Sequence, residues 1–125
     1  MQQLLFIALG GALGALARYG LGSRVHSLWG AAWPLGTLLI NGLGSLAIGV
    51  IFALLERSVI HPDWRSVVMV GFLGAFTTFS TFSLETVQLF ERGHGGLALA
   101  YGLGSTVLCV AAAAIGVGLT RAALG

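Results

Sequence analysis

Four long apolar runs make up most of this chain and leave little polar sequence between them. They cover approximately residues 4–22, 34–55, 66–90 and 97–119. Each run is close to the ~20 residues that a helix needs to cross the hydrocarbon core of a bilayer. Only 8% of the residues are charged, against roughly a quarter in soluble domains. The sequence therefore predicts an all-α membrane protein with four transmembrane helices in a single domain, residues 1–125.

The connections are predicted at residues 23–33, 56–65 and 91–96, where the charges and turn formers gather. The two sides of the membrane would carry nearly equal numbers of arginines. An excess of basic residues on one side normally sets the orientation of a membrane protein, and this near balance favours neither orientation. Two outcomes stay open: a chain that inserts both ways and forms antiparallel dimers, or a weakly biased chain that inserts one way.

Small residues recur at intervals of four, a spacing that lets helix backbones approach closely. The pairs are Gly10 and Gly14, Ser45 and Gly49, Ala112 and Gly116, and Ala114 and Gly118. Four short helices shelter a polar pathway poorly, so we expect an oligomer.

Composition also excludes several classes of function. All six basic residues are arginines, and they are too scattered for a nucleic-acid-binding surface. The glycine-rich residues 10–14 lack the Lys-Ser/Thr of a phosphate loop, and no nucleophile–base pair or metal-ligand set is visible, so no enzyme is predicted. The single cysteine, Cys109, lies in an apolar run and is predicted to be a small buried hydrophobe.

A polar stretch from Thr77 to Glu85 interrupts the third apolar run with five hydroxyls, two phenylalanines and one carboxylate. Hydrocarbon offers such groups no partners, so they must face protein, water or a ligand. Thr78, Thr81 and Glu85 are spaced by three and four and share one helix face. Hydroxyls are neutral donors, which suit conduction because they do not trap an ion. Glu85 itself is a proton carrier, a cation ligand or a hydrogen-bond acceptor.

Phe79 and Phe82 lie on a neighbouring face, three residues apart. The edge of an aromatic ring is electropositive and favours an anion. The alternative is that both rings face lipid or fill the core.

Gly71 and Gly74 weaken the helix just before Thr77 and Thr78, which can bond back to the backbone. A local break would expose carbonyl oxygens that suit a hard cation such as Na⁺. The alternative is a continuous helix whose glycines serve packing alone.

Polar residues also occur in the other apolar runs. Asn41 is either a donor to an anion or a hydrogen-bonding partner between helices, and Thr37 lies one turn earlier on its face. Arg18 either reaches the interface or places a positive charge in an aqueous vestibule. Tyr101 and Ser105 are four apart and can point inward together.

Three sequence blocks carry a resemblance to a known family. They are residues 10–19 (GGALGALARY), 36–44 (GTLLINGLG) and 71–82 (GFLGAFTTFSTF). In this order they resemble the Fluc-type fluoride channels, small fluoride-exporting membrane proteins of bacteria. Ala75 stands where the family pattern often has a second glycine.

The resemblance implies a fluoride-selective channel in the bacterial inner membrane that exports fluoride passively and limits its toxicity. It implies an antiparallel, dual-topology homodimer with two pores, surrounded by lipid. The fluoride pathway would comprise Thr37, Asn41, Phe79, Ser80, Thr81, Phe82, Glu85, Tyr101 and Ser105, with Arg18 toward the vestibule. The backbone carbonyls of Gly74 and Thr77 would hold a structural Na⁺ at the centre of the dimer.

A proton-coupled small multidrug exporter is the alternative function. Such exporters also have about four spans, but they resemble one another in carrying an acidic residue in the first span. This chain has only Arg18 there, and its membrane carboxylate is Glu85.

Overall fold

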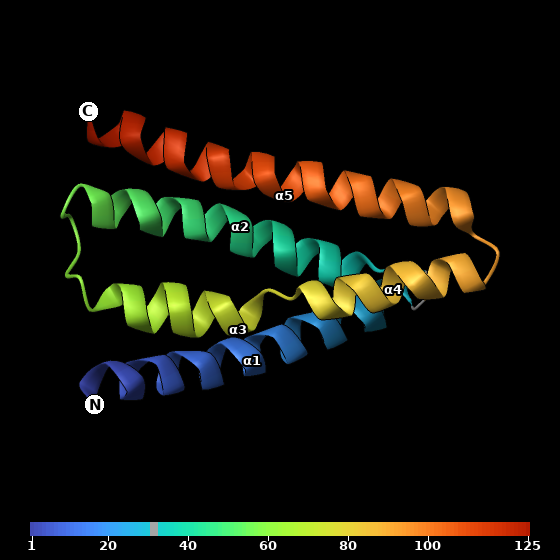
Figure 1. The fold of residues 1–125 in the computed structure, drawn as a ribbon, viewed down its shortest axis with the longest axis horizontal. Helices are drawn as coiled ribbons and strands as arrows, with labels where there is room; N and C mark the ends of the chain where they lie inside the picture. Colours follow the sequence, from blue (N-terminus) through green and yellow to red (C-terminus); the bar gives the residue numbers. More distant parts are fainter. Residues whose placement is uncertain (31–32) are drawn as a thin grey trace.

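A computed structural model describes residues 1–30 and 33–125, and every element in these ranges is helical (Figure 1). The chain forms α1 (Gln2–Trp29), α2 (Leu35–Glu56), the π-helical η1 (Arg65–Leu73), α3 (Gly74–Phe76), α4 (Phe79–Glu91) and α5 (Gly95–Leu124). Four helical segments are long and apolar enough to cross a membrane, the third being the run from Arg65 to Glu91. The prediction of an all-α chain with four membrane-spanning helices is confirmed.

The helices run side by side, and both termini lie at the same end of the bundle (Figure 1). The most extensive contacts pair α2 with α5 and α1 with η1, while α4 packs on α5. A two-pronged ion pair joins α2 to α5 near the termini, with Arg121 Nη2 2.8 Å and Nε 2.9 Å from the Glu56 carboxylate oxygens.

The first helix is longer than its apolar run, so the predicted connection at 23–33 is wrong in its first part. Helix α1 continues through Ser23 to Trp29 and ends at Gly30, whose φ of 81° lies in the left-handed region. Hydropathy marks where the membrane-like stretch ends, whereas a helix ends at a residue that breaks its backbone geometry. Residues 31 and 32 of this connection lie outside the described part of the chain.

The first small-residue pair, Gly10 and Gly14, brings helix backbones together, as predicted. A β-carbon on Gly10 would collide with the Val67 carbonyl oxygen, and one on Gly14 with that of Phe72, so α1 lies directly against the third span. Such close approach is what small residues provide at membrane helix interfaces.

Glycines also let α2 and α5 approach closely, but not every predicted small residue takes part. A β-carbon on Gly49 would meet the carbonyl oxygen of Ala113, and one on Gly116 would meet that of Leu46. No atom of the described residues lies within 4 Å of a β-carbon placed on Gly118, so Gly118 makes no close helix contact there.

The buried core is split into two small clusters. One consists of Ile40, Leu73 and Phe76, and the other of Leu89, Ala98 and Tyr101. The first includes the end of α3 and the second packs on α4, so the clusters lie before and after the same point of the third span. Most large apolar side chains, such as Leu103 and Val107, are exposed on the outside, where lipid would cover them.

Gly116→Ala is expected to destabilise the protein, whereas Gly118→Ala is not. Alanine favours a helix over glycine by about 1 kcal/mol, but overpacking against a backbone carbonyl costs about 1–3 kcal/mol. The midpoint of thermal unfolding in detergent should therefore fall for Gly116→Ala and stay or rise for the control. Equal midpoints for the two variants would contradict the close α2–α5 contact.

Candidate functional site

The third span is interrupted at Thr77 and Thr78, whose backbones are extended between α3 and α4. Each threonine closes one helix end. The Thr77 amide and hydroxyl both donate to the Leu73 carbonyl oxygen, at 3.1 and 2.9 Å. The Thr78 hydroxyl accepts from the Thr81 amide at 3.2 Å and caps α4. Two adjacent threonines thus end one helix and begin the next.

Asn41 of α2 pairs with both backbone groups of Thr78. Its Nδ2 donates to the Thr78 carbonyl at 2.9 Å, and its Oδ1 accepts from the Thr78 amide at 2.8 Å. Of the two roles considered for Asn41, bonding between helices is the one present in the protomer. One hydrogen of its amide group stays available to another acceptor, so a donor role toward an anion remains a prediction.

Arg18 reaches the same interruption from α1. Its Nε donates to the Ala75 carbonyl oxygen at 3.1 Å, and its side chain is half-buried. In an unbroken helix that carbonyl would accept from the amide of Phe79. This bond ties Arg18 to the third span, and both roles considered for its charge, at the interface or in an aqueous vestibule, stay predictions. No sequence signal pointed to Ala75, because a partner 57 positions away is set by packing.

The interruption also changes the hydrogen-bond partners of two backbone amides, so that two helical carbonyl oxygens lose their usual donors. In a continuous helix Thr78 would donate to Gly74, and Thr81 would donate to Thr77. Here those amides donate to the side chains of Asn41 and Thr78 instead. The Gly74 and Thr77 oxygens are hard neutral donors, a ligand type that fits Na⁺. Within the described residues no three His, Cys, Asp or Glu side chains form a group that could hold a metal ion.

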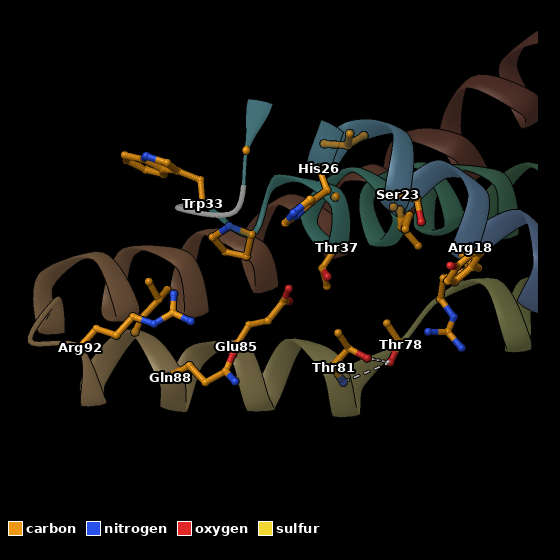
Figure 2. A pocket seen from close by; sticks show the side chains of 18 residues that line it. Arg18, Ser23, His26, Trp33, Thr37, Thr78, Thr81, Glu85, Gln88 and Arg92 are labelled. Carbon is orange, nitrogen blue, oxygen red and sulfur yellow. Dashed lines mark hydrogen bonds between the residues drawn. The ribbon is translucent and has the colours of Figure 1, made fainter. Parts of the chain in front are cut away.

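A polar cavity of about 460 Å³ lies on one side of the interruption (Figure 2). Arg18 lies at one end of this view and Arg92 near the other, with Thr37, Thr81 and Glu85 between them. All five side chains line the cavity. We call this space the vestibule cavity, and it brings the predicted site residues Arg18, Thr37, Thr81 and Glu85 together.

Sequence reasoning missed several residues that line the vestibule cavity, among them His26, Gln88 and Arg92. Gln88 and Arg92 continue the three-and-four spacing that begins at Thr78, Thr81 and Glu85, so extending that stripe would have found them. His26 was assigned to a connection, but it lies in the last turn of α1.

A second cavity of about 380 Å³ contains the phenylalanines. It is lined by Asn41, Thr77, Thr78, Phe79, Phe82, Ser105 and Cys109, among others. We call it the ring cavity, and it shares Thr78 with the vestibule cavity. The ring centroids of Phe79 and Phe82 are 5.5 Å apart, and those of Phe82 and Tyr101 are 5.1 Å apart. The three rings thus form a continuous row.

Tyr101 joins this row to the polar side of the site. Its hydroxyl donates to Glu85 Oε1 at 3.0 Å, so Glu85 is a hydrogen-bond acceptor in the protomer. Ser105, one turn further along α5, is buried, and its hydroxyl has no partner among the described residues. Ser80 lines neither cavity and lies beside the Thr78 hydroxyl at 3.4 Å.

Comparison with known proteins identifies the family. Residues 5–117 match the model described as CrcB-like protein, Camphor Resistance (CrcB). The chain belongs to this family. A relative from Magnetococcus marinus is 48% identical, over 96% of this chain and 98% of its own length. One from Saccharophagus degradans is 46% identical over 94% and 88%, and one from Thermus thermophilus is 44% identical over the full length of both.

Each of these relatives is named a fluoride-specific ion channel FluC. The resemblance inferred from the three sequence blocks is confirmed at the level of the family. Like the other members, this chain is a multi-pass membrane protein and not an enzyme.

Asn41→Ala is expected to destabilise the interruption. The change leaves the amide and carbonyl of Thr78 without Asn41, and an unpaired buried polar group costs about 1–3 kcal/mol. Asn41→Asp keeps one acceptor oxygen but loses the donor, so its thermal midpoint should lie between those of Asn41→Ala and the wild type.

Thr106→Ala is the control for these two variants. Among the described residues, its exposed hydroxyl bonds only to the Gly102 carbonyl within its own helix, so the midpoint should hardly change. A wild-type midpoint for Asn41→Ala would contradict the role of Asn41 in holding the break.

Proposed function

We propose that this chain forms a fluoride-selective channel that lets fluoride leave the cell passively. The observation that carries the proposal is the meeting of the two cavities at Thr78, where hydroxyls and phenylalanine rings surround the same interruption. The names of the relatives support fluoride as the ion. An inside-negative potential drives an anion outward by about 2.3 kcal/mol per 100 mV, so the proposed export needs no other energy source.

The proposed path begins in the vestibule cavity, where the Arg18 guanidinium attracts the anion while bonded to Ala75. Hydroxyls of Thr37 and Thr81 then replace part of the hydration shell. Tyr101, fixed by Glu85, leads to the row of rings. Neutral donors hold an anion weakly enough for it to move on, as conduction requires.

In the ring cavity the edges of Phe79 and Phe82 face the ion. Ser105 contributes a buried hydroxyl that has no partner among the described residues, and Asn41 contributes its remaining amide hydrogen. Ser80 lies at the margin, beside Thr78. Positive ring edges and neutral donors together stabilise a small, strongly hydrated anion without a fixed positive charge at the narrow point.

The functional unit we propose is an antiparallel homodimer with two pores. Phe79 is 78% exposed although it lines the ring cavity, so a second copy would complete that wall. The near balance of arginines at the two ends of the bundle supports insertion in both orientations. Each side of the membrane would then receive one vestibule cavity.

We further propose that a sodium ion lies between the two copies. The carbonyl oxygens of Gly74 and Thr77 would hold it, two from each protomer, because their helical amide partners donate elsewhere. When bound, the ion would neutralise the four converging oxygen dipoles and tie the two interruptions together.

Fluoride efflux from potassium-loaded liposomes tests the channel. After valinomycin is added, we expect rapid release of fluoride without chloride. Phe79→Ala and Phe82→Ala should each slow fluoride release about tenfold or more, since about 1.4 kcal/mol of lost ring–ion interaction equals a factor of ten.

Phe90→Ala is the matched control, because this phenylalanine is also on α4 but lines neither cavity. Its release rate should stay near that of the wild type. Equal release of chloride, or drug efflux that requires a proton gradient, would overturn the channel and favour the exporter.

Replacing sodium by N-methylglucamine is expected to lower the thermal midpoint of the purified dimer and to favour dissociation. A ligand bound only by the assembled form stabilises it by about 2.7 kcal/mol at a hundredfold excess over its Kd. Light scattering in each salt measures the oligomer, and an unchanged dimer in both salts would contradict the proposed ion.

The antiparallel arrangement has its own readout. His94→Cys in a Cys109→Ser background places one thiol at the 92–94 connection, outside the spans. A membrane-impermeant thiol reagent should label roughly half of these chains in sealed cells, as two opposite orientations require. Complete labelling, or none, would show a single orientation.

A further inference from the structure

Three residues of α5 form a stripe that points toward the phenylalanines. Tyr101, Ser105 and Cys109 are spaced by four, so each lies about 6 Å along the helix from the last and on nearly the same face. Tyr101 contacts Phe82, and both Ser105 and Cys109 line the ring cavity. The thiol of Cys109 is therefore the third polar group of this face, one turn beyond the Ser105 hydroxyl.

The stripe ends where two helices close on each other. The next position at the same spacing is Ala113, whose carbonyl oxygen lies against Gly49 of α2. This contact leaves no room for a side chain on Gly49 and closes the space between α2 and α5. Cys109 thus lies at the last open level of the ring cavity.

The buried hydroxyl of Ser105 is a second observation that points to a ligand or water at this end of the ring cavity. The Ser105 side chain is only 6% exposed, it lines the ring cavity, and its hydroxyl has no partner among the described residues. A buried hydroxyl without a partner costs free energy unless water or another ligand visits it. Water that reaches Ser105 reaches the neighbouring thiol, because the two residues line one cavity.

We propose that Cys109 is a modification site on the ion path, where a small thiol-directed group closes the channel. The inference rests on the proposed function, since it places the thiol beside the route of fluoride. It replaces the sequence-based reading of Cys109 as a small buried hydrophobe: the thiol is half-buried and borders a cavity. A thiomethyl adduct would fill space between α5 and the rings and hinder a hydrated ion.

The covalent step is a thiol exchange with methyl methanethiosulfonate. The Cys109 thiol loses its proton to water, and the thiolate sulfur attacks the thiomethyl sulfur of the reagent. A new S–S bond forms, the S–S bond of the reagent breaks, and methanesulfinate leaves with the electron pair. Dithiothreitol reverses the step by reducing the mixed disulfide. Because the reaction needs a thiolate, it requires access to water.

The experiment measures two quantities on the same liposomes: the fraction of chains that carry the thiomethyl group, by intact mass, and the fluoride release rate. For the wild type we expect modification and a release rate reduced about tenfold or more, because an obstructed path loses conduction steeply. Dithiothreitol should restore both the mass and the rate. Each variant is compared with its own untreated rate.

Two variants provide the controls. Cys109→Ser should show neither the mass change nor the slowing. Val107→Cys in that background places a thiol on the outer face of the same helix, where Val107 is 69% exposed and lines neither cavity. This thiol faces lipid, so it should react much more slowly, and its modification should leave the release rate unchanged.

Each contrary result has a distinct meaning. Full modification of Cys109 with an unchanged release rate would overturn its place on the path. An unreactive Cys109 would overturn the access to water, and slowing through the Val107→Cys thiol would show that the effect is not local. Absence of fluoride release before treatment would instead overturn the proposed function itself.

Discussion

The paired hydrogen bonds between the Asn41 side chain and the Thr78 backbone are the interaction on which the rest of the site depends. A helix interrupted inside a membrane exposes amides and carbonyls that lipid cannot pair, at several kcal/mol each. Asn41 satisfies two of these groups, Arg18 satisfies the Ala75 carbonyl, and each threonine closes one helix end. Three helices therefore share the stabilisation of one break.

This break organises the space around it. The core separates into two clusters, one before and one after the interruption, and two cavities meet at Thr78. Gly10, Gly14, Gly49 and Gly116 hold the surrounding helices at backbone contact, whereas open space remains where both cavities border Thr78. Small residues thus allow close helix packing at the glycine contacts, while space remains beside Thr78.

The chemistry of the two cavities differs in a way that fits the proposed passage of an anion. The vestibule cavity has arginines toward its two ends, and these raise the local concentration of anions. At the rings the polar groups are neutral hydroxyls and the Asn41 amide, whereas the Glu85 carboxylate lines the vestibule cavity and accepts from Tyr101. Conduction favours a path that attracts the ion by charge at its entrance and binds it only weakly, through neutral groups, further in.

Sequence alone determined the number of spans, because apolar length must match bilayer thickness, and it determined the face shared by Thr78, Thr81 and Glu85, because helical periodicity is local. The close approach at Gly10 and Gly14 followed from spacing in the same way. Only the tertiary structure decided that Arg18 bonds to Ala75, that Asn41 pairs with Thr78, and that Cys109 borders a cavity. These contacts join residues far apart in the chain, and their partners depend on how the helices pack, which no periodicity within one segment encodes.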